Sequence, residues 1–194
     1  MKKFITEVFK DPPILITKNL VLRKLERTDY NDMYEYASLS EVTKYLTWDP
    51  HPDLQYTRKY LTFIGAKYKA CDFFDWAVCL RDSGKMIGTC GFTELDERNM
   101  CGEIGYVINP KYRGNGYAEE AAKRFFEFGF EELALQRIQA RFMVGNEASR
   151  HVMEKLGMQF EGINRNALHV RGKFVSVGVY SILRDELYKI KTTG

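Results

Sequence analysis

The chain has 194 residues, of which 45% are hydrophobic and 14% aromatic, which is enough for one substantial core and short for two. Its 29 basic and 26 acidic residues leave a net charge of only +3, and the basic residues form no block, which disfavours nucleic acid as a partner. The sequence shows neither the apolar core of a signal peptide nor a run of about 18 apolar residues. We therefore expect a single domain over residues 1–194, cytoplasmic and without a membrane partner.

The cysteines and histidines lack the spacings of a metal site. No CxxC pair and no HExxH motif occurs, so we expect neither a bound metal nor a disulfide framework. Buried free thiols are the expected state of the four cysteines, which are Cys71, Cys79, Cys90 and Cys101.

The first elements are a strand and a group of helices. NLVLRKL at 19–25 alternates as a strand, and Thr28 and Asp29 then provide a helix start. Apolar residues recur at helical spacing from 28 to 70, except in WDPHPD at 48–53, where two prolines cannot continue a helix. The pattern predicts helices on both sides of a loop.

The rest of the chain alternates strands and helices. Two strands over 75–95 turn through Asp82–Gly84, and the polar turn DERN leads to a strand at 101–109. A helix with a buried face runs from Tyr117 to Leu133, and a strand, a short helix and two further strands follow, at 137–144, 146–156 and within 158–184. The order predicts an α/β (mixed α+β) fold with a sheet of about seven strands.

The segment NPKYRGNGYAEEA, 109–121, joins the fourth strand to the following helix through two glycines. The first NH groups of a helix and its dipole attract an anion, and glycines let a phosphate approach the backbone, although a plain turn with a helix cap has the same appearance. There is no GxxxxGK[ST] motif, and Glu119 replaces the third glycine of GxGxxG. What remains is the pattern Arg113-x-x-Gly116-x-Ala118.

This pattern resembles the [Q/R]-x-x-G-x-[G/A] pyrophosphate loop of the GNAT N-acetyltransferases. EIGYVINPKYRGNGYAEEA, RIQARFMVGNEASRHVMEKLGMQFEG and the WDPHPD loop are similar to the RimJ/RimL branch of that superfamily, over about residues 16 to 185. The resemblance implies the GNAT fold, in which helices flank a central, mostly antiparallel mixed sheet. It also implies that the fourth and fifth strands, 101–109 and 137–144, splay apart to admit acetyl-CoA.

The resemblance implies particular contacts to acetyl-CoA. The pyrophosphate would be held by backbone NH groups of Arg113, Gly114, Asn115, Gly116 and Ala118. The pantetheine would pair with the main chain of Tyr106, Val107 and Ile108 and with the amide of Asn146, near Ser149.

Acetyl transfer to an amine requires that the amine lose a proton, because α-amines have a pKa of about 8 and lysines about 10.4. Glu103, on the fourth strand, lies where GNAT enzymes often place the base, although a glutamate on an alternating strand is equally a surface residue. The leaving thiolate takes a proton from a helix tyrosine in many GNAT enzymes, but Met153 occupies that place here. Ser149 is the alternative donor, or a capping residue, and the Val107 NH would meet the oxyanion.

The acceptor pocket is the least defined part of the prediction. Trp48 and His51 of the WDPHPD loop are expected to line it, or to act as a packing plug. Phe92 and Glu94 lie on a strand that faces either the cleft or the core. A group of carboxylates is expected to gather at the mouth and attract a cationic amine: Asp49, Asp53, Glu94, Asp96, Glu97 and Glu103.

The predicted function is acetyl-CoA-dependent N-acetylation of a primary amine. A protein or peptide N-terminal α-amine is favoured, because it needs less deprotonation than lysine, by about 2.4 pKa units. Polyamines or aminoglycosides are the alternative acceptors. A CoA-binding sensor without catalysis and a phosphate-loop protein of another kind are the alternative functions. The sequence leaves the oligomeric state open, with a homodimer among the alternatives because dimers are common in the family that it resembles.

Overall fold

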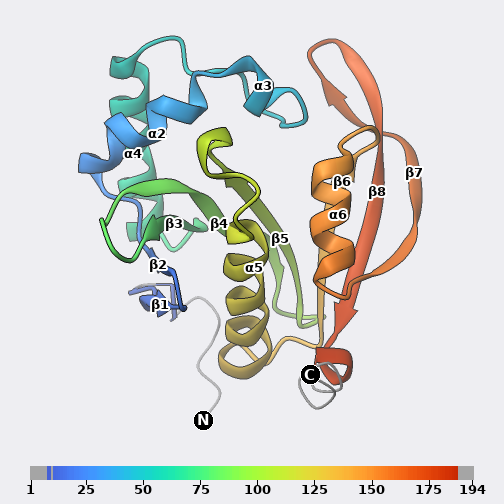
Figure 1. Cartoon of the computed structure of the whole chain (residues 1–194). Coiled ribbons are helices and arrows are strands. Elements are labelled where there is room, and N and C mark those ends of the chain that lie inside the picture. Colours follow the sequence, from blue (N-terminus) through green and yellow to red (C-terminus); the bar gives the residue numbers. More distant parts are fainter. Residues whose placement is uncertain (1–7, 10, 188–194) are drawn as a thin grey trace.

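The computed structural model describes residues 8–9 and 11–187. A twisted sheet of eight strands runs through it in the order β1-β2-β3-β4-β5-β6-β8-β7 (Figure 1). The strands are β1 Leu15–Ile16, β2 Leu20–Arg23, β3 Phe74–Leu80, β4 Met86–Asp96, β5 Cys101–Ile108, β6 Arg137–Met143, β7 Gln159–Val170 and β8 Lys173–Leu183. All neighbours pair antiparallel except β5 and β6, which are parallel. This confirms the predicted GNAT fold, with the two-residue β1 as a strand beyond the seven expected.

Helices cover both faces of the sheet. One group comprises α2 Tyr30–Ala37, α3 Ser40–Thr43 and α4 Leu54–Lys69, and the other comprises α5 Tyr117–Glu127 and α6 Glu147–Lys155. The WDPHPD loop separates α3 from α4, as predicted, and α4 starts where the Asp53 carboxylate accepts the Tyr56 NH at 2.7 Å. The predicted helix up to Leu133 is α5 followed by a π-helical turn, Phe128–Glu132.

Strand alternation divides the core between these two groups of helices. On one face of β3, Trp76 packs against Phe125 of α5, with ring centroids 5.1 Å apart. On the other face, Ala77 and Cys79 pack with residues of α2 and α4, among them Tyr36 and Leu61. Successive side chains of a strand point to opposite faces, so one face of the sheet belongs to α5 and the other to α2 and α4.

The fork between β5 and β6 is the feature that positions the site. Cys101–Ile104 pairs with Arg137–Ala140, and the pairing ends there. The remaining halves, Gly105–Ile108 and Arg141–Met143, diverge, while β6 stays paired with β8 along its whole length. The predicted splaying is therefore confirmed. In Figure 1, α5 lies in front of β5 and α6 in front of β6, one on each side of the fork.

Two further expectations concern the cysteines and membranes. All four cysteines are free, but only Cys79 and Cys90 are buried; Cys71 and Cys101 are half-buried, because they lie in the turn after α4 and at the first residue of β5. None of the helices in the described residues combines the length and the apolar character needed to span a bilayer.

Candidate active site

The glycine loop joins β5 to α5 through a short ordered turn. Asn109 Oδ1 accepts the Lys111 NH at 3.1 Å and starts the 3-10 turn Pro110–Tyr112. The Asn115 amide donates to the carbonyls of Tyr112 and Arg113, at 3.1 and 3.3 Å. Lys111 pairs with Glu35 of α2 at 2.6 Å. The loop is thereby held in one shape from within and from α2.

Both glycines of the loop have left-handed backbones, with φ +80° at Gly114 and +77° at Gly116. No atom lies within 4 Å of a Cβ built on either one. Gly116 is the N-cap of α5 and has no side chain to cap the first NH groups of the helix. Uncapped NH groups, exposed space and the positive end of a helix dipole fit a phosphate, so the residues present match the pyrophosphate site that the sequence predicts.

The main chain of β5 offers hydrogen-bonding groups to the fork. The Asn109 NH bonds to the Ile87 carbonyl of β4 at 2.8 Å. Because antiparallel bonds alternate along a strand, the NH and carbonyl of Val107 are then directed at β4, and those of Tyr106 and Ile108 at the fork. Two of the three predicted pantetheine-pairing residues therefore face the place where a ligand would lie.

Tyr106 and Ser149 meet across the fork. The Tyr106 side chain lies on the α5 face, and its hydroxyl is 3.3 Å from Ser149 Oγ and donates to the Ser149 carbonyl at 3.2 Å. Burial raises the pKa of Tyr106 well above its ordinary value. Asn146 Oδ1 accepts the Ser149 NH at 3.3 Å and caps α6. The structure thus brings together Tyr106, Asn146 and Ser149. The contact between the Tyr106 hydroxyl and Ser149 is one that no spacing in the sequence indicated.

Glu103 lies on the opposite face, at the base of the fork, and is 7% exposed. Arg141 Nε pairs with its Oε2 at 2.6 Å, the Gln139 amide donates to Oε2 at 2.9 Å, and the Thr93 hydroxyl donates to Oε1 at 3.1 Å. Arg141 also lies 3.8 Å from Glu94. Glu103 is thus a buried, paired carboxylate and not a surface residue of an alternating strand.

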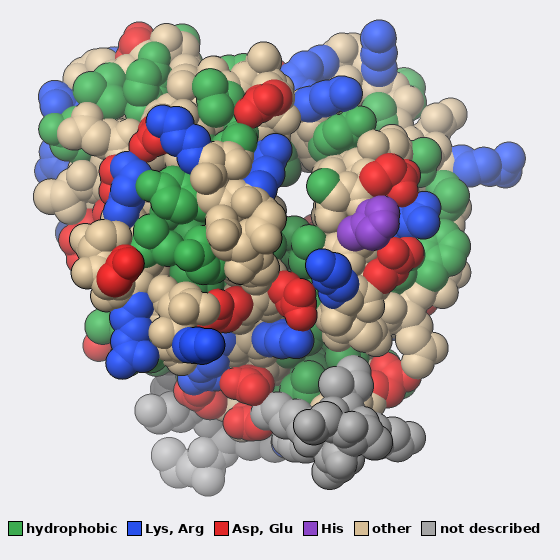
Figure 2. Space-filling model, in the orientation of Figure 1, with side chains coloured by type: hydrophobic (Ala, Val, Ile, Leu, Met, Phe, Trp, Pro, Cys, Tyr) green, Lys and Arg blue, Asp and Glu red, His purple; other side chains and the backbone are tan. Residues whose placement is uncertain are grey.

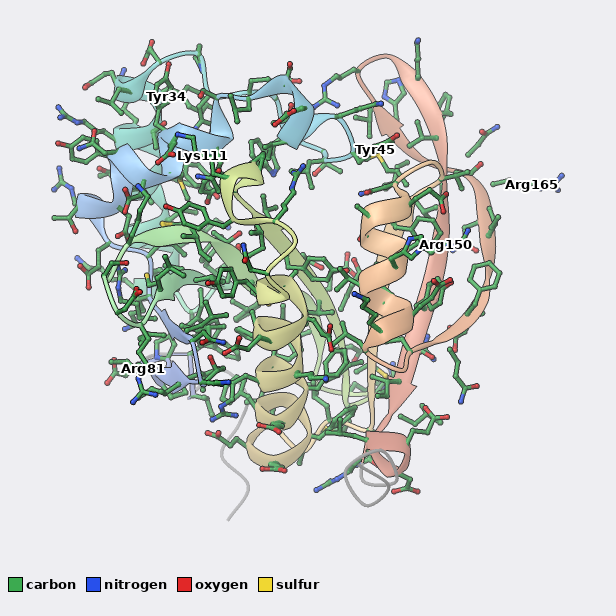
Figure 3. The ribbon with its side chains drawn as sticks, viewed as in Figure 1. Tyr34, Tyr45, Arg81, Lys111, Arg150 and Arg165 are labelled. Atoms are coloured by element: carbon green, nitrogen blue, oxygen red, sulfur yellow. The ribbon has the colours of Figure 1, made fainter. Side chains whose placement is uncertain are left out.

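A bridge closes the open end of the fork on this face. Arg171, at the turn of the β7–β8 hairpin, pairs with Asp49 at 2.7 Å and donates to the carbonyls of Trp48 at 2.6 Å and Thr43 at 3.2 Å. Tyr45 approaches Gly145 from the same loop (Figure 3). Figure 2 shows an opening through the molecule below this bridge. The two halves of the sheet are therefore joined at both ends of the fork.

The WDPHPD loop packs into this bridge. His51 is buried, its Nδ1 is 2.9 Å from the Thr57 hydroxyl, and its ring lies 5.7 Å from the Trp48 ring. Burial lowers the pKa of His51 below its ordinary value. These contacts make His51 a packing residue of the loop, whereas Trp48 is half-buried and packs against the cluster under α2 and α4, as Val107 does.

Two expectations about the acceptor side are wrong. Phe92 is 2% exposed and packs on Phe125 of the α5 face at 5.7 Å, so it belongs to the core. The six carboxylates do not gather at one mouth, because most are used locally. Asp53 caps α4 and Asp96 caps its own turn through Asn99, while Asp49 lies on the bridge and Glu103 at the base of the fork.

Comparisons with known proteins agree with this geometry. Residues 19–159 match the family model of the acetyltransferase (GNAT) domain. The chain is 32% identical over 172 residues to the uncharacterized N-acetyltransferase p20 of Bacillus licheniformis, covering 89% of this chain and 97% of that one. A crystal structure of a GNAT-family acetyltransferase from Bacillus anthracis superposes with a TM-score of 0.79 at 32% identity, covering 90% of this chain and 100% of that one.

Two relatives carry names that mention an acceptor. The putative ribosomal N-acetyltransferase YdaF of Bacillus subtilis is 28% identical, over 88% of this chain and 94% of its own. The spermidine N(1)-acetyltransferase of Escherichia coli is 27% identical, over 79% of this chain and 80% of its own. The chain belongs to the GNAT acetyltransferase family, in its RimJ/RimL-like branch, and is an acetyl-CoA-dependent N-acetyltransferase.

Proposed function

We propose that this enzyme acetylates the α-amine at the N-terminus of a protein or peptide, with acetyl-CoA lying in the fork between β5 and β6. The observation that carries the proposal is the fork itself. Its α5 side leads to the uncapped loop at Gly116, and its opposite side holds the buried carboxylate of Glu103. Acetyl-CoA in the fork would place its phosphates at the loop, and its thioester would lie where an amine can approach from the side of Glu103.

The cosubstrate supplies the activated acetyl group, and the chain supplies its binding contacts. Backbone NH groups of the loop and the first turn of α5 hold the phosphates. The main-chain groups of Tyr106 and Ile108 pair with the amides of the pantetheine, together with Asn146. The NH groups at the fork also face the oxygen on which negative charge develops; Val107, whose NH is directed at β4, is the less suitable donor of the three.

Proton transfers are assigned to the two faces of the fork. Glu103 takes a proton from the acceptor amine through a water, because Arg141, Gln139 and Thr93 already contact both of its oxygens directly. The pair of Tyr106 and Ser149 donates a proton toward the leaving sulfur, because their hydroxyls lie 3.3 Å apart across the fork.

The α-amine is favoured over a lysine side chain because its pKa is lower. Removing its proton at neutral pH costs about 3 kcal/mol less free energy than removing that of lysine. The name of YdaF, a putative ribosomal N-acetyltransferase, supports a protein acceptor. The second candidate is a small polyamine, which the similarity to a spermidine acetyltransferase supports.

The test is a competition for acetyl groups. A peptide with a free N-terminus and one internal lysine is offered with acetyl-CoA, spermidine is offered in parallel, and mass spectrometry locates the label while thiol release measures the rate. We expect the label on the N-terminus. Labelling mainly on lysine or spermidine would refute the acceptor assignment, and acetyl-CoA binding without thiol release from any amine would favour a CoA-binding sensor.

A further inference from the structure

A row of polar side chains crosses the sheet on the face opposite α5 and α6. Glu103 on β5 is the register partner of Gln139 on β6, and Gln139 is in turn the register partner of Ser181 on β8. Residues that lie opposite each other on neighbouring strands point to the same face of the sheet. The row therefore continues from the proposed base into the half of the sheet that carries the β7–β8 hairpin.

The far end of this row is an ion pair. Arg137 lies two residues before Gln139, on the same face of β6. Its two terminal nitrogens donate to the Glu161 carboxylate at 2.5 and 2.6 Å, and the Ser181 hydroxyl donates to that carboxylate at 2.8 Å. The bond to Arg137 lowers the pKa of Glu161 below its ordinary value, so both partners are charged at neutral pH. A bidentate pair of this kind holds the guanidinium in one orientation.

A β-bulge places Glu161 in this pair. β7 pairs with β8 through Phe160 and Tyr180 and then through Gly162 and Val179, so Glu161 is the extra residue between the two pairs. Bulges are frequent beside functional sites, where they redirect a side chain. Here the carboxylate of the extra residue is directed at the polar row.

Arg137 fixes the direction of the Gln139 amide. Its Nη2 donates to Gln139 Oε1 at 3.2 Å, and a guanidinium has only donors, so the atom that faces it must be the amide oxygen. The amide nitrogen of Gln139 is therefore directed to the other side, where it donates to Glu103 Oε2 at 2.9 Å. The partners at the two ends of the amide thus require the same orientation.

The donors around Glu103 are distributed unequally over its two oxygens. Oε2 receives N–H groups of Gln139 at 2.9 Å and Arg141 at 2.6 Å, whereas Oε1 receives the Thr93 hydroxyl at 3.1 Å. An ionised carboxylate offers about four acceptor sites, about two for each oxygen. Oε2 is therefore filled, and an acceptor site remains on Oε1.

The titratable groups around Glu103 on this face come from four strands: Glu94 on β4, Cys101 on β5, Arg137 and Arg141 on β6, and Glu161 on β7. Arg141 contacts Glu103 directly, and Gln139 separates Glu103 from the pair of Arg137 and Glu161. Gln139 is uncharged, so it supplies a second donor to Oε2 without adding a positive charge. A second arginine at this place would oppose the protonation of the carboxylate.

We propose, on the basis of the N-acetyltransferase function above, that Gln139 is a positioning residue for the general base Glu103. Together with Arg141 it occupies Oε2, so the water that relays the proton of the acceptor amine bonds to the acceptor site left on Oε1. The amine gives a proton to this water while the water gives one to Oε1, and the nitrogen keeps the electron pair that attacks the acetyl carbonyl. Arg137 and Glu161 prevent the amide from turning over, which would place its oxygen against the carboxylate.

The test follows the protonation of Glu103 and the rate of acetyl transfer separately. Protein labelled at the glutamate carboxyl carbons is titrated by NMR, and the Glu103 signal is identified by its absence from Glu103→Gln. In Gln139→Glu two carboxyl groups share the site, so we expect the pair to take up a proton at least about 1 pH unit above the wild-type titration of Glu103. Gln139→Leu removes the donor without adding a charge and should lower kcat about 10-fold, with acceptor KM and acetyl-CoA affinity nearly unchanged.

The matched control is Gln159, a glutamine that continues the same row as the register partner of Ser181 and bonds to Glu186. Gln159→Glu and Gln159→Leu should leave both the titration of Glu103 and kcat unchanged. Arg137→Met leaves the amide free to turn over and should lower kcat about 3-fold, less than loss of the donor itself.

Three results would overturn the positioning role: wild-type kcat in Gln139→Leu, an unmoved titration in Gln139→Glu, or equal changes in the Gln159 variants. Wild-type kcat in Glu103→Gln would also overturn it, because Glu103 would then not be the base. If Gln139→Glu does not fold, the kcat of Gln139→Leu decides. A wild-type protein that binds no acetyl-CoA, or releases no thiol with any amine, would instead refute the proposed function.

Discussion

The two sides of the β5–β6 fork are built in different ways. On the α5 side, the candidate phosphate site is the backbone of consecutive residues, Arg113 to Ala118, with open space at both glycines. On the other side, the candidate acceptor site consists of side chains from β4, β5, β6, the loop after α3 and the β7–β8 hairpin, several of them bonded to one another. In the proposed enzyme, phosphate binding would therefore depend on one loop, and acceptor selection would depend on contacts between distant segments.

The largest effect is expected from Gly116→Asp, which should lower acetyl-CoA affinity at least about 1,000-fold. The new carboxylate would occupy the phosphate position and repel the ligand. Calorimetry with acetyl-CoA measures this. Gly84→Asp is the control, since Gly84 has a similar left-handed backbone, φ +70°, and equally open surroundings in the β3–β4 turn. Equal affinities of the two variants would refute the phosphate loop.

Glu103→Gln should reduce kcat about 100- to 10,000-fold at neutral pH and leave acetyl-CoA affinity nearly unchanged, as expected for loss of a general base. The deficit should shrink as pH rises, because the amine then loses its proton without help. Steady-state rates between pH 6 and 10 measure this. Glu94→Gln is the control, because Glu94 also lies near Arg141 but is exposed. If Glu103→Gln kept wild-type rates over this pH range, Glu103 would not be the general base, and its role would be to hold Arg141 in place.

Arg171→Ala should open the bridge and raise the acceptor KM about 3- to 10-fold, while bulky peptides become better substrates relative to small amines. The reason is that Arg171 joins the hairpin to Asp49, to the Thr43 carbonyl at the end of α3 and to two carbonyls of the following loop. Rates with a series of acceptors test selectivity, and hydrogen exchange at residues 44–49 tests the loss of contact. The control is Arg165→Ala, on β7, where the side chain points away from the molecule (Figure 3). Unchanged selectivity would show that the bridge has no part in it.

The smallest effect concerns stability. The folded-state pKa of Asp75, about 7, lies above the ordinary value of about 3.9. The folded protein therefore holds the proton of this β3 carboxyl group more tightly than the unfolded chain does. The free energy of unfolding is unaffected by this group below about pH 4, and it falls as the pH rises from 4 through 7. Asp75→Asn should therefore be more stable than wild type at pH 8, by about 1 to 2 kcal/mol, with a smaller advantage at pH 5. Urea unfolding at the two pH values measures this. A difference that does not change with pH would mean that Asp75 is ionised throughout.

The elements that the sequence predicted well have local signals. The glycines of the 113–116 loop, the Asp53 cap and the alternation of 101–109 each act through neighbouring residues, and the structure has a loop, a helix start and a strand at those places. β1 was missed because two residues contain no periodicity. The prediction that Phe92 lines the acceptor pocket was wrong, because alternation shows that a strand has two faces but does not show which face meets the core.

The sequence by itself therefore determined the family and the fold and predicted the loop at 113–118 as the candidate phosphate site, because backbone conformation, helix polarity and hydrophobic period depend on residues close in the chain. Only the tertiary structure decided which distant residues meet around the fork. Tyr106 meets Ser149 across 43 residues, and Arg171 meets Asp49 across 122. It also buried the Tyr36 hydroxyl without a hydrogen-bond partner in the described part of the chain. Contacts of that kind depend on strand register and helix packing, which a pattern of residue types along the chain does not specify.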